Sequence, residues 1–227
     1  MSRIQAHLLL IDPQNDFCDF AVSPCPPALP VPGADADLRR IAALIRRVGK
    51  ALSAITLTQD SHHFLDIAHP GFWRSADGSA VPPFTTISAA ALRAGDFLPR
   101  RIDARQRVQA YLDELEAAGR YQHTVWPVHC RIGSWGQGVH ADLLAACDEW
   151  SAATLCNVAT VAKGQNPWTE HYSALRAEVP VAGDPATATN EALLESLREA
   201  YVLYVAGEAG SHCVKATVEH LMEALTP

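Results

Sequence analysis

Four short apolar runs, separated by helix-forming segments, constrain the fold of this chain more than any other feature of its sequence. The runs are "AHLLLID" (6–12), "SAITLTQD" (53–60), "TLCNVATVAKG" (154–164) and "YVLYVAGE" (201–208). Helical segments are predicted between and after them, at 35–52, 103–118, 140–149, 190–200 and 211–225. This alternation predicts an α/β fold, a three-layer sandwich with a parallel central sheet and helices on both of its faces.

Length and charge limit the number of domains and the kind of partner. A chain of 227 residues suits one domain over 1–227. Its net charge is −7 and no run of Lys and Arg exceeds a pair, which argues against a nucleic-acid or membrane surface and favours a small-molecule partner. The apolar segment before Asp12 is too short for a signal peptide or membrane span, so we expect a cytoplasmic protein.

Chemically active residues stand at or just after the ends of these strands. Asp12, Asp60 and Lys163 end three of them, and Cys213 follows the fourth by one turn. Ligands of open parallel sheets bind at the C-terminal ends of the strands. The sequence therefore predicts that an acid, a base and a thiol converge at one edge of the sheet.

Cys213 lies in "GEAGSHCVKAT", where a strand is followed by a Gly-containing turn and a helix. A helix N-terminus favours the thiolate, and its free N–H groups can bind an oxyanion. Taken singly, Cys213 could be a buried structural cysteine, Lys163 part of a surface ion pair and Asp12 a strand-end cap. Together they form the set that a thiol nucleophile requires.

A second cluster lies in "TLTQDSHHFLDIAHPGFW" (56–73). A bend in this loop could bring Asp60, His62 and His69 onto one divalent cation, and such ligands suit Zn, Mn or Fe. The alternatives are a solvated loop, or His63 as a ligand in place of its neighbour. Spacing alone does not connect the distant His129 to this set.

Five stretches resemble one family in the same order along the chain. They are "LLLIDPQNDFC", "LTQDSHHFLDIAHPGF", "WPVHC", "VAKGQNPWTEHYSAL" and "GSHCVKAT". Together, from about residue 6 to the end of the chain, they are similar to the nicotinamidase branch of the isochorismatase-like cysteine hydrolases. A conjunction of five ordered blocks is more specific than any one of them.

The resemblance implies a complete site for hydrolysis of a carboxamide. Cys213 would be the nucleophile, Asp12 the general base and later acid, and Lys163 their neighbour. One divalent metal ion, with zinc as the first choice and manganese or iron as alternatives, would be bound by Asp60, His62, His69 and His129. The amides of Ala209 and Cys213 would form an oxyanion hole after a cis peptide between Glu208 and Ala209. Phe17 and Trp126 would flank the substrate ring.

The sequence departs from this family in three places. The loop before the cysteine usually reads Ala-Thr-Asp-x-Cys, but here it is "AGSHC" (209–213), which lacks the carboxylate. An inserted segment of about 70–125 separates His69 from His129, and we expect it to be a lid, a subunit contact or a helical decoration. Relatives also continue with a further strand and helix, so we expect a truncated chain or a sheet edge covered by another subunit of a homo-oligomer.

Three functions follow from these observations. The first is a metal-containing cysteine amidase acting on nicotinamide or a related heteroaromatic carboxamide, through a thioester intermediate. The second is an isochorismatase-like or carbamoyl hydrolase. The four candidate metal-ligating residues argue against this second function. The third is a catalytically silent ligand-binding protein on the same fold, which the altered "AGSHC" loop keeps open.

Overall fold

The core of the molecule is a four-stranded parallel sheet with the strand order β7-β2-β1-β8. The computed structural model describes residues 5–225. The strands are β1 (Ala6–Ile11), β2 (Leu52–Asp60), β7 (Ala159–Lys163) and β8 (Val202–Gly207). Each corresponds to one of the four apolar runs, so the predicted parallel sheet is confirmed.

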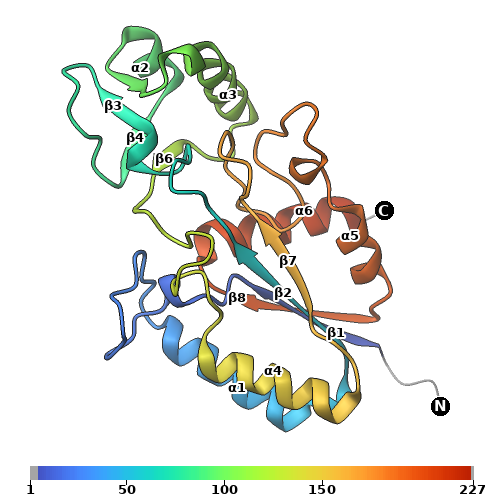
Figure 1. Cartoon of the computed structure of the whole chain (residues 1–227). Coiled ribbons are helices and arrows are strands. Elements are labelled where there is room, and N and C mark those ends of the chain that lie inside the picture. Colours follow the sequence, from blue (N-terminus) through green and yellow to red (C-terminus); the bar gives the residue numbers. More distant parts are fainter. Residues whose placement is uncertain (1–4, 226–227) are drawn as a thin grey trace.

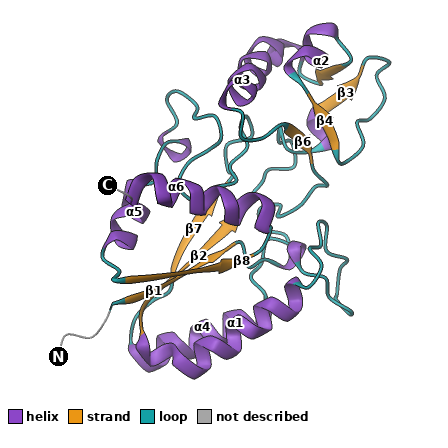
Figure 2. Ribbon diagram, turned by 180° about the vertical axis from the view of Figure 1, so that it is seen from behind, coloured by secondary structure: helices purple, strands orange, loops and turns teal. Residues whose placement is uncertain are grey.

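Helices cover both faces of this sheet, as predicted (Figures 1 and 2). One face carries α1 (Ala34–Val48) and α4 (Ala141–Thr154), and the other carries α5 (Glu191–Arg198) and α6 (Lys215–Leu225). Alternate residues of β1 supply the two cores, because successive side chains of a strand point to opposite faces. Leu8 and Leu10 pack with the α1–α4 layer, whereas Leu9 and Ile11 pack with the α5–α6 layer.

Short helical turns complete the sandwich and set some boundaries that differ from the predicted ones. The 3₁₀ turns are Asn15–Phe17, Gly49–Ala51, Pro70–Phe72, Ile102–Ala104 and Pro185–Thr187, and Gly210–Val214 is a π turn. Helix α4 extends beyond its predicted end at residue 149 and stops where Leu155 takes a left-handed backbone conformation, with φ 58°. Strand β7 consequently begins later than the apolar run that predicted it.

The insertion between the two histidine blocks forms a small unit with its own core. It contains β3 (Trp73–Ser75) paired with β5 (Phe97–Pro99), β4 (Thr85–Ile87) paired with β6 (His123–Val125), α2 (Ala89–Ala94) and α3 (Arg105–Ala118). Figure 1 shows it projecting beyond one end of the central sheet. Trp73, Leu92 and Leu112 are fully buried in a cluster that also includes Ile67 of the preceding loop. The insertion therefore packs directly on the loop that carries the first two histidines.

Strand β8 is an edge strand of the described sheet. The expectation of a truncated chain concerns the C-terminal end of the sequence. Residues 226–227 lie outside the part that the structure describes, so this expectation stays a prediction. No helix within residues 5–225 is both long enough and apolar enough to cross a bilayer.

The close approach of β8 to β1 requires a glycine at position 207. A Cβ built on Gly207 would lie 2.6 Å from the Ile11 nitrogen, and φ is +144° there. We expect Gly207→Ala to lower the free energy of unfolding by at least about 2 kcal/mol, because overpacking and backbone strain add. Urea unfolding measures the loss. Gly78→Ala is the control, since φ is +85° there but no atom lies within 4 Å, and a loss as large as that of Gly207→Ala would contradict the close-packing argument.

Candidate active site

The structure brings Asp12, Lys163 and Cys213 together at the C-terminal edge of the sheet. Asp12 follows β1, Lys163 ends β7 and Cys213 lies in the π turn between β8 and α6. The Lys163 Nζ is 2.9 Å from Asp12 Oδ2 and 3.7 Å from Cys213 Sγ. All three residues are buried. An acid, a cation and a thiol thus share one small volume from which bulk water is excluded.

Lys163 also connects this group to the histidine loop. Its Nζ lies 3.1 Å from Asp60 Oδ1 and donates a hydrogen bond to the His171 carbonyl at 3.1 Å. Burial alone lowers the pKa of an amine, but the Asp12 and Asp60 carboxylates outweigh it and raise the pKa of Lys163 well above its ordinary value. The residue is therefore a permanent cation between two carboxylates.

The side chain of Asp12 is oriented by Thr58 on the neighbouring strand. The Thr58 hydroxyl donates to Asp12 Oδ1 at 2.6 Å and accepts from the Asp12 backbone N–H at 3.0 Å. The backbone of Asp12 has a left-handed conformation, with φ 47°, which directs the chain out of the sheet. Gln14 makes a pair of bonds to the backbone of Asp60, at 2.8 and 2.7 Å. Side chains of adjacent segments thereby fix the carboxylate of Asp12 and the backbone of Asp60.

Three expectations about the cysteine loop were wrong. Burial raises the pKa of the Cys213 thiol well above its ordinary value, Lys163 opposes this and Asp12 adds to it, so Cys213 rests as a thiol rather than a thiolate. The cysteine lies in a π turn before α6, not in the first turn of a regular α-helix. The Glu208–Ala209 peptide is trans, as is every peptide bond of residues 5–225, and the turn is made instead by a left-handed Ala209 with φ 55°.

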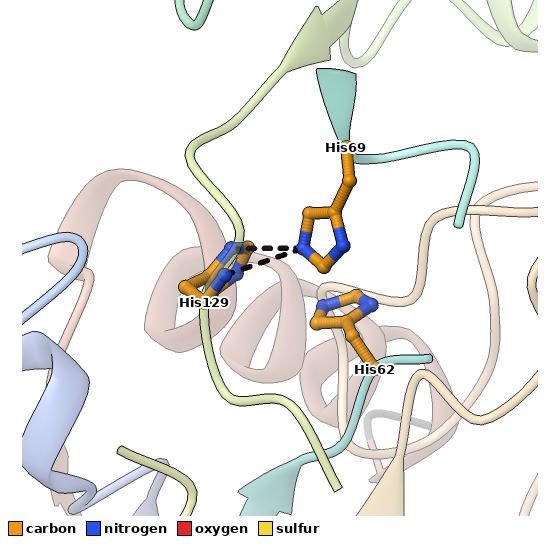
Figure 3. A group of neighbouring side chains, drawn as sticks. All are labelled: His62, His69 and His129. Atoms are coloured by element: carbon orange, nitrogen blue, oxygen red, sulfur yellow. Dashed lines mark hydrogen bonds between the residues drawn. The ribbon is translucent and has the colours of Figure 1, made fainter. Parts of the chain in front are cut away.

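Three of the predicted metal ligands form a compact cluster. His62, His69 and His129 are buried, and each offers a ring nitrogen within 4.8 Å of those of the other two. Figure 3 shows the three rings pointing toward one another from separate segments. The fourth, Asp60, joins through Oδ2, which lies 3.0 Å from His62 Nε2 and 3.4 Å from His129 Nε2. His63, the alternative ligand, has an exposed side chain and lies outside the cluster.

The other nitrogen of each ring faces an oxygen outside the cluster. His62 Nδ1 lies 3.2 Å from Asp66 Oδ2, His69 Nδ1 lies 3.2 Å from the His63 carbonyl, and His129 Nδ1 lies 2.8 Å from the Pro127 carbonyl. Metal-ligating histidines ordinarily donate their second N–H in this way, which fixes ring and tautomer. Burial lowers the pKa of His69 to about 3, which keeps that ring neutral as a ligand must be. The Asp60 and Asp66 carboxylates outweigh burial and raise the pKa of His62, so that ring must lose a proton when a cation binds. The donor set therefore fits a divalent cation.

Asp66, which faces His62 Nδ1, allows a test of these contacts of the second ring nitrogens. We expect Asp66→Asn to weaken binding of Zn²⁺ about 10- to 100-fold, because a neutral amide no longer polarises and orients His62. Competition with a chelating dye measures the affinity. Asp77→Asn, at an exposed aspartate of the insertion, is the control. An affinity unchanged by Asp66→Asn would show that His62 is not a ligand oriented by this carboxylate.

A cavity of about 200 Å³ opens between the two groups of residues. Its walls include the aromatic side chains of Phe17, Trp126 and Tyr172, and Cys213, Asp60 and His129 reach it from the two polar clusters. This size suits a ligand of one ring. Both residues expected to flank a substrate ring therefore line the same cavity as the thiol.

Sequence reasoning missed several residues of this site. Leu29, Pro30 and Val31 form a wall, although no motif in the sequence pointed to them. Asp66 and Glu170 lie within the recognised blocks "LTQDSHHFLDIAHPGF" and "VAKGQNPWTEHYSAL", and the position of Asp66, four residues after the candidate ligand His62, was an available signal.

The insertion contributes indirectly to the cavity. None of the described residues that line it falls within 70–125, but Trp126 directly follows β6, and the rings of Phe84 and Trp126 are 6.1 Å apart. Tyr121 stacks on His212, another residue of the wall, at a ring separation of 5.4 Å. The insertion thus supports wall residues, and its role as a lid stays a prediction.

Comparison with known proteins identifies the fold. No protein-family model matches the sequence, and no curated protein matches it. The yeast nicotinamidase Pnc1p bound to the inhibitor nicotinaldehyde matches over 96% of this chain and 82% of its own, with TM-score 0.62 and 21% identity. A nicotinamidase/pyrazinamidase of Acinetobacter baumanii matches over 99% and 80%, with TM-score 0.62 and 21% identity. A pyrazinamidase of Pyrococcus horikoshii in complex with zinc matches over 97% and 79%, with TM-score 0.53 and 20% identity.

These matches cover nearly the whole chain, at an identity that establishes likeness of fold. The chain therefore has the same fold as these nicotinamidases and pyrazinamidases, as the five sequence blocks implied.

Proposed function

We propose that this protein is a metal-containing cysteine amidase that hydrolyses nicotinamide or a related heteroaromatic carboxamide to the carboxylate and ammonia. The observation that carries the proposal is the contact of Lys163 with both Asp12 and Cys213 at the wall of an aromatic cavity that the histidine cluster also reaches. The solved structures of the same fold support it, since they are of nicotinamidases and pyrazinamidases, one of them bound to nicotinaldehyde.

The first half of the reaction forms a thioester. As Cys213 Sγ attacks the carboxamide carbon, Asp12 accepts the thiol proton, which matches a cysteine whose raised pKa keeps it protonated at rest. The amides of Ala209 and Cys213 hold the oxyanion. Asp12 then gives its proton to the departing nitrogen, the C–N bond breaks and ammonia leaves.

The second half hydrolyses the thioester. Asp12, again a carboxylate, takes a proton from water as the water oxygen attacks the acyl carbon. The C–S bond breaks as Asp12 returns that proton to the sulfur, and the carboxylic acid formed loses its remaining proton to solvent and leaves as the carboxylate. The Lys163 ammonium, 2.9 Å from Asp12 Oδ2, balances the charge of that carboxylate between the steps.

The remaining residues bind and orient the substrate. Asp60, His62, His69 and His129 would hold the divalent cation, with zinc as our first choice. When bound, the cation supplies a Lewis-acidic position for the ring nitrogen of the substrate. Phe17 and Trp126 would sandwich the ring and so align its carboxamide with Cys213.

Ammonia release from a panel of amides tests the proposed function. Zinc-loaded protein should release ammonia from nicotinamide or pyrazinamide and much less from aliphatic amides, because only a ring fills the aromatic cavity. Turnover should disappear after chelation and return with Zn²⁺. Hydrolysis of carbamoyl or vinyl-ether substrates alone would favour the alternative of an isochorismatase-like or carbamoyl hydrolase. Zinc binding without any hydrolysis would favour the alternative of a catalytically silent ligand-binding protein.

A further inference from the structure

We propose that Glu170 is a specificity-determining residue whose carboxyl group hydrogen-bonds to a polar atom or substituent on the ring of the substrate. The inference rests on the proposed function and narrows its substrate class to carboxamides whose ring carries such a group in addition to the nitrogen assigned to the cation. The Asp12–Lys163–Cys213 chemistry and the histidine cluster do not use this residue.

The side chain of Glu170 is buried without a partner at the wall of the cavity. The residue is 3% exposed, and its Oε1 is inaccessible and has no hydrogen-bond partner. Neither carboxyl oxygen accepts a hydrogen bond within residues 5–225. Nearly all buried polar groups of native proteins are paired, and an unpaired one costs free energy until a ligand satisfies it. Glu170 lines the cavity of the thiol, so the missing partner is most simply a bound molecule.

The backbone around Glu170 is held in place. The Glu178 N–H donates to the Glu170 carbonyl at 2.8 Å, and the Thr169 hydroxyl donates to the Val179 carbonyl at 2.7 Å. One residue further on, the His171 carbonyl accepts from Lys163. A carboxyl group on such a fixed segment can select a ligand by position.

The residues that line the cavity with Glu170 indicate what its carboxyl group contributes to substrate binding. Phe17, Leu29 and Val31 make the nearby walls apolar, so a carboxyl group among them adds direction to otherwise nonspecific contacts. Asp60 Oδ2 lies 3.0 Å from His62 Nε2, whereas no carboxyl oxygen of Glu170 pairs with a cluster histidine within residues 5–225, which argues against a role as metal ligand. Burial raises its pKa to about 8, so that near neutral pH it both donates and accepts hydrogen bonds.

Binding to zinc-loaded Cys213→Ala protein tests this inference without any need for turnover. Calorimetry would compare pyrazinamide, which has a second ring nitrogen besides the one assigned to the cation, with nicotinamide, which has none. We expect Glu170→Leu to reduce the preference for pyrazinamide at least about tenfold, and Glu170→Gln, which keeps a donor and an acceptor, to retain it within about threefold. Glu178→Leu is the matched control, because Glu178 is also largely buried with an unpartnered Oε1 but does not line the cavity.

Two further readouts keep the test decisive. Zn²⁺ affinity, measured by chelator competition, should be unchanged in Glu170→Leu, and a tenfold loss would overturn the inference by making Glu170 a support of the metal. If Glu170→Leu does not fold, infrared difference spectra replace it. Pyrazinamide should shift a carboxyl band of the protein with Glu170 intact, and the shift should be absent from Glu170→Gln.

The outcomes separate this inference from the proposed function. An unchanged preference in folded Glu170→Leu would overturn the role of Glu170 alone. Absence of ammonia release from the protein with Cys213 intact, together with a preference that depends on Glu170, would overturn the proposed function alone. If neither amide bound, both would fail.

Discussion

Replacement of Cys213 by alanine is expected to lower kcat for carboxamide hydrolysis by about 10⁴-fold or more, as loss of the nucleophile does in other acyl-transfer enzymes. No other cysteine can substitute for it, since Cys213 is the only cysteine within residues 5–225 that lines the cavity. Its sulfur is also 3.7 Å from the Lys163 ammonium. The measurement is steady-state ammonia release by zinc-loaded protein.

Cys147→Ala is the matched control for the loss of a buried thiol. Cys147 is 2% exposed and packs in the α1–α4 layer, on the opposite face of the sheet from α6. We expect this variant to retain kcat within about twofold while losing some stability to the small cavity it creates. Equal losses of activity in the two variants would indicate a structural rather than a nucleophilic role for Cys213.

Lys163→Met is the second large effect that we expect, because it removes the cation shared by two buried carboxylates. Breaking a buried ion pair from one side typically costs about 3–5 kcal/mol, since the remaining charge is left uncompensated. Asp12 and Asp60 would both be left uncompensated, and without this cation the pKa of the Asp60 carboxyl should rise. We expect a fall of that size in the free energy of unfolding near pH 7, measured with urea, together with loss of turnover.

The sign of the pH dependence follows from the same contacts. Asp60 has a folded-state pKa well below its ordinary value, so its stabilisation is present at neutral pH and is lost as the pH falls. Lys163→Met should therefore lose less stability at pH 3 than at pH 7. Lys215→Met, at an exposed lysine of α6, should leave the unfolding midpoint unchanged. A Lys163→Met protein as stable as the unsubstituted one would contradict the shared-cation account.

Much of the architecture could be predicted because local pattern and global fold agree. Buried parallel strands must be apolar throughout, so "AHLLLID" and "SAITLTQD" were recognisable without any knowledge of their partners. The rule that strand ends share one edge then placed Asp12, Asp60 and Lys163 near one another, as the structure shows.

The parts that could not be predicted depend on contacts between distant segments. The strands of the insertion are three residues long, too short for periodicity to reveal, and they are stabilised by a core shared with Ile67 and Val179. The thiol pKa was misjudged because the position of Cys213 near a helix suggested a favourable dipole, whereas burial beside Asp12 dominates. The carboxyl of Glu170 has no local signal, since its burial follows only from the folding of the loop.

Trapping of the acyl intermediate with hydroxylamine during turnover of nicotinamide is the most direct test of the central claim. A thioester on Cys213 would partition between water and hydroxylamine. We therefore predict that the zinc-loaded enzyme forms nicotinohydroxamic acid in proportion to the hydroxylamine added, and that Cys213→Ala forms none. Release of ammonia with nicotinic acid as the sole product at every hydroxylamine concentration would contradict a cysteine-bound intermediate.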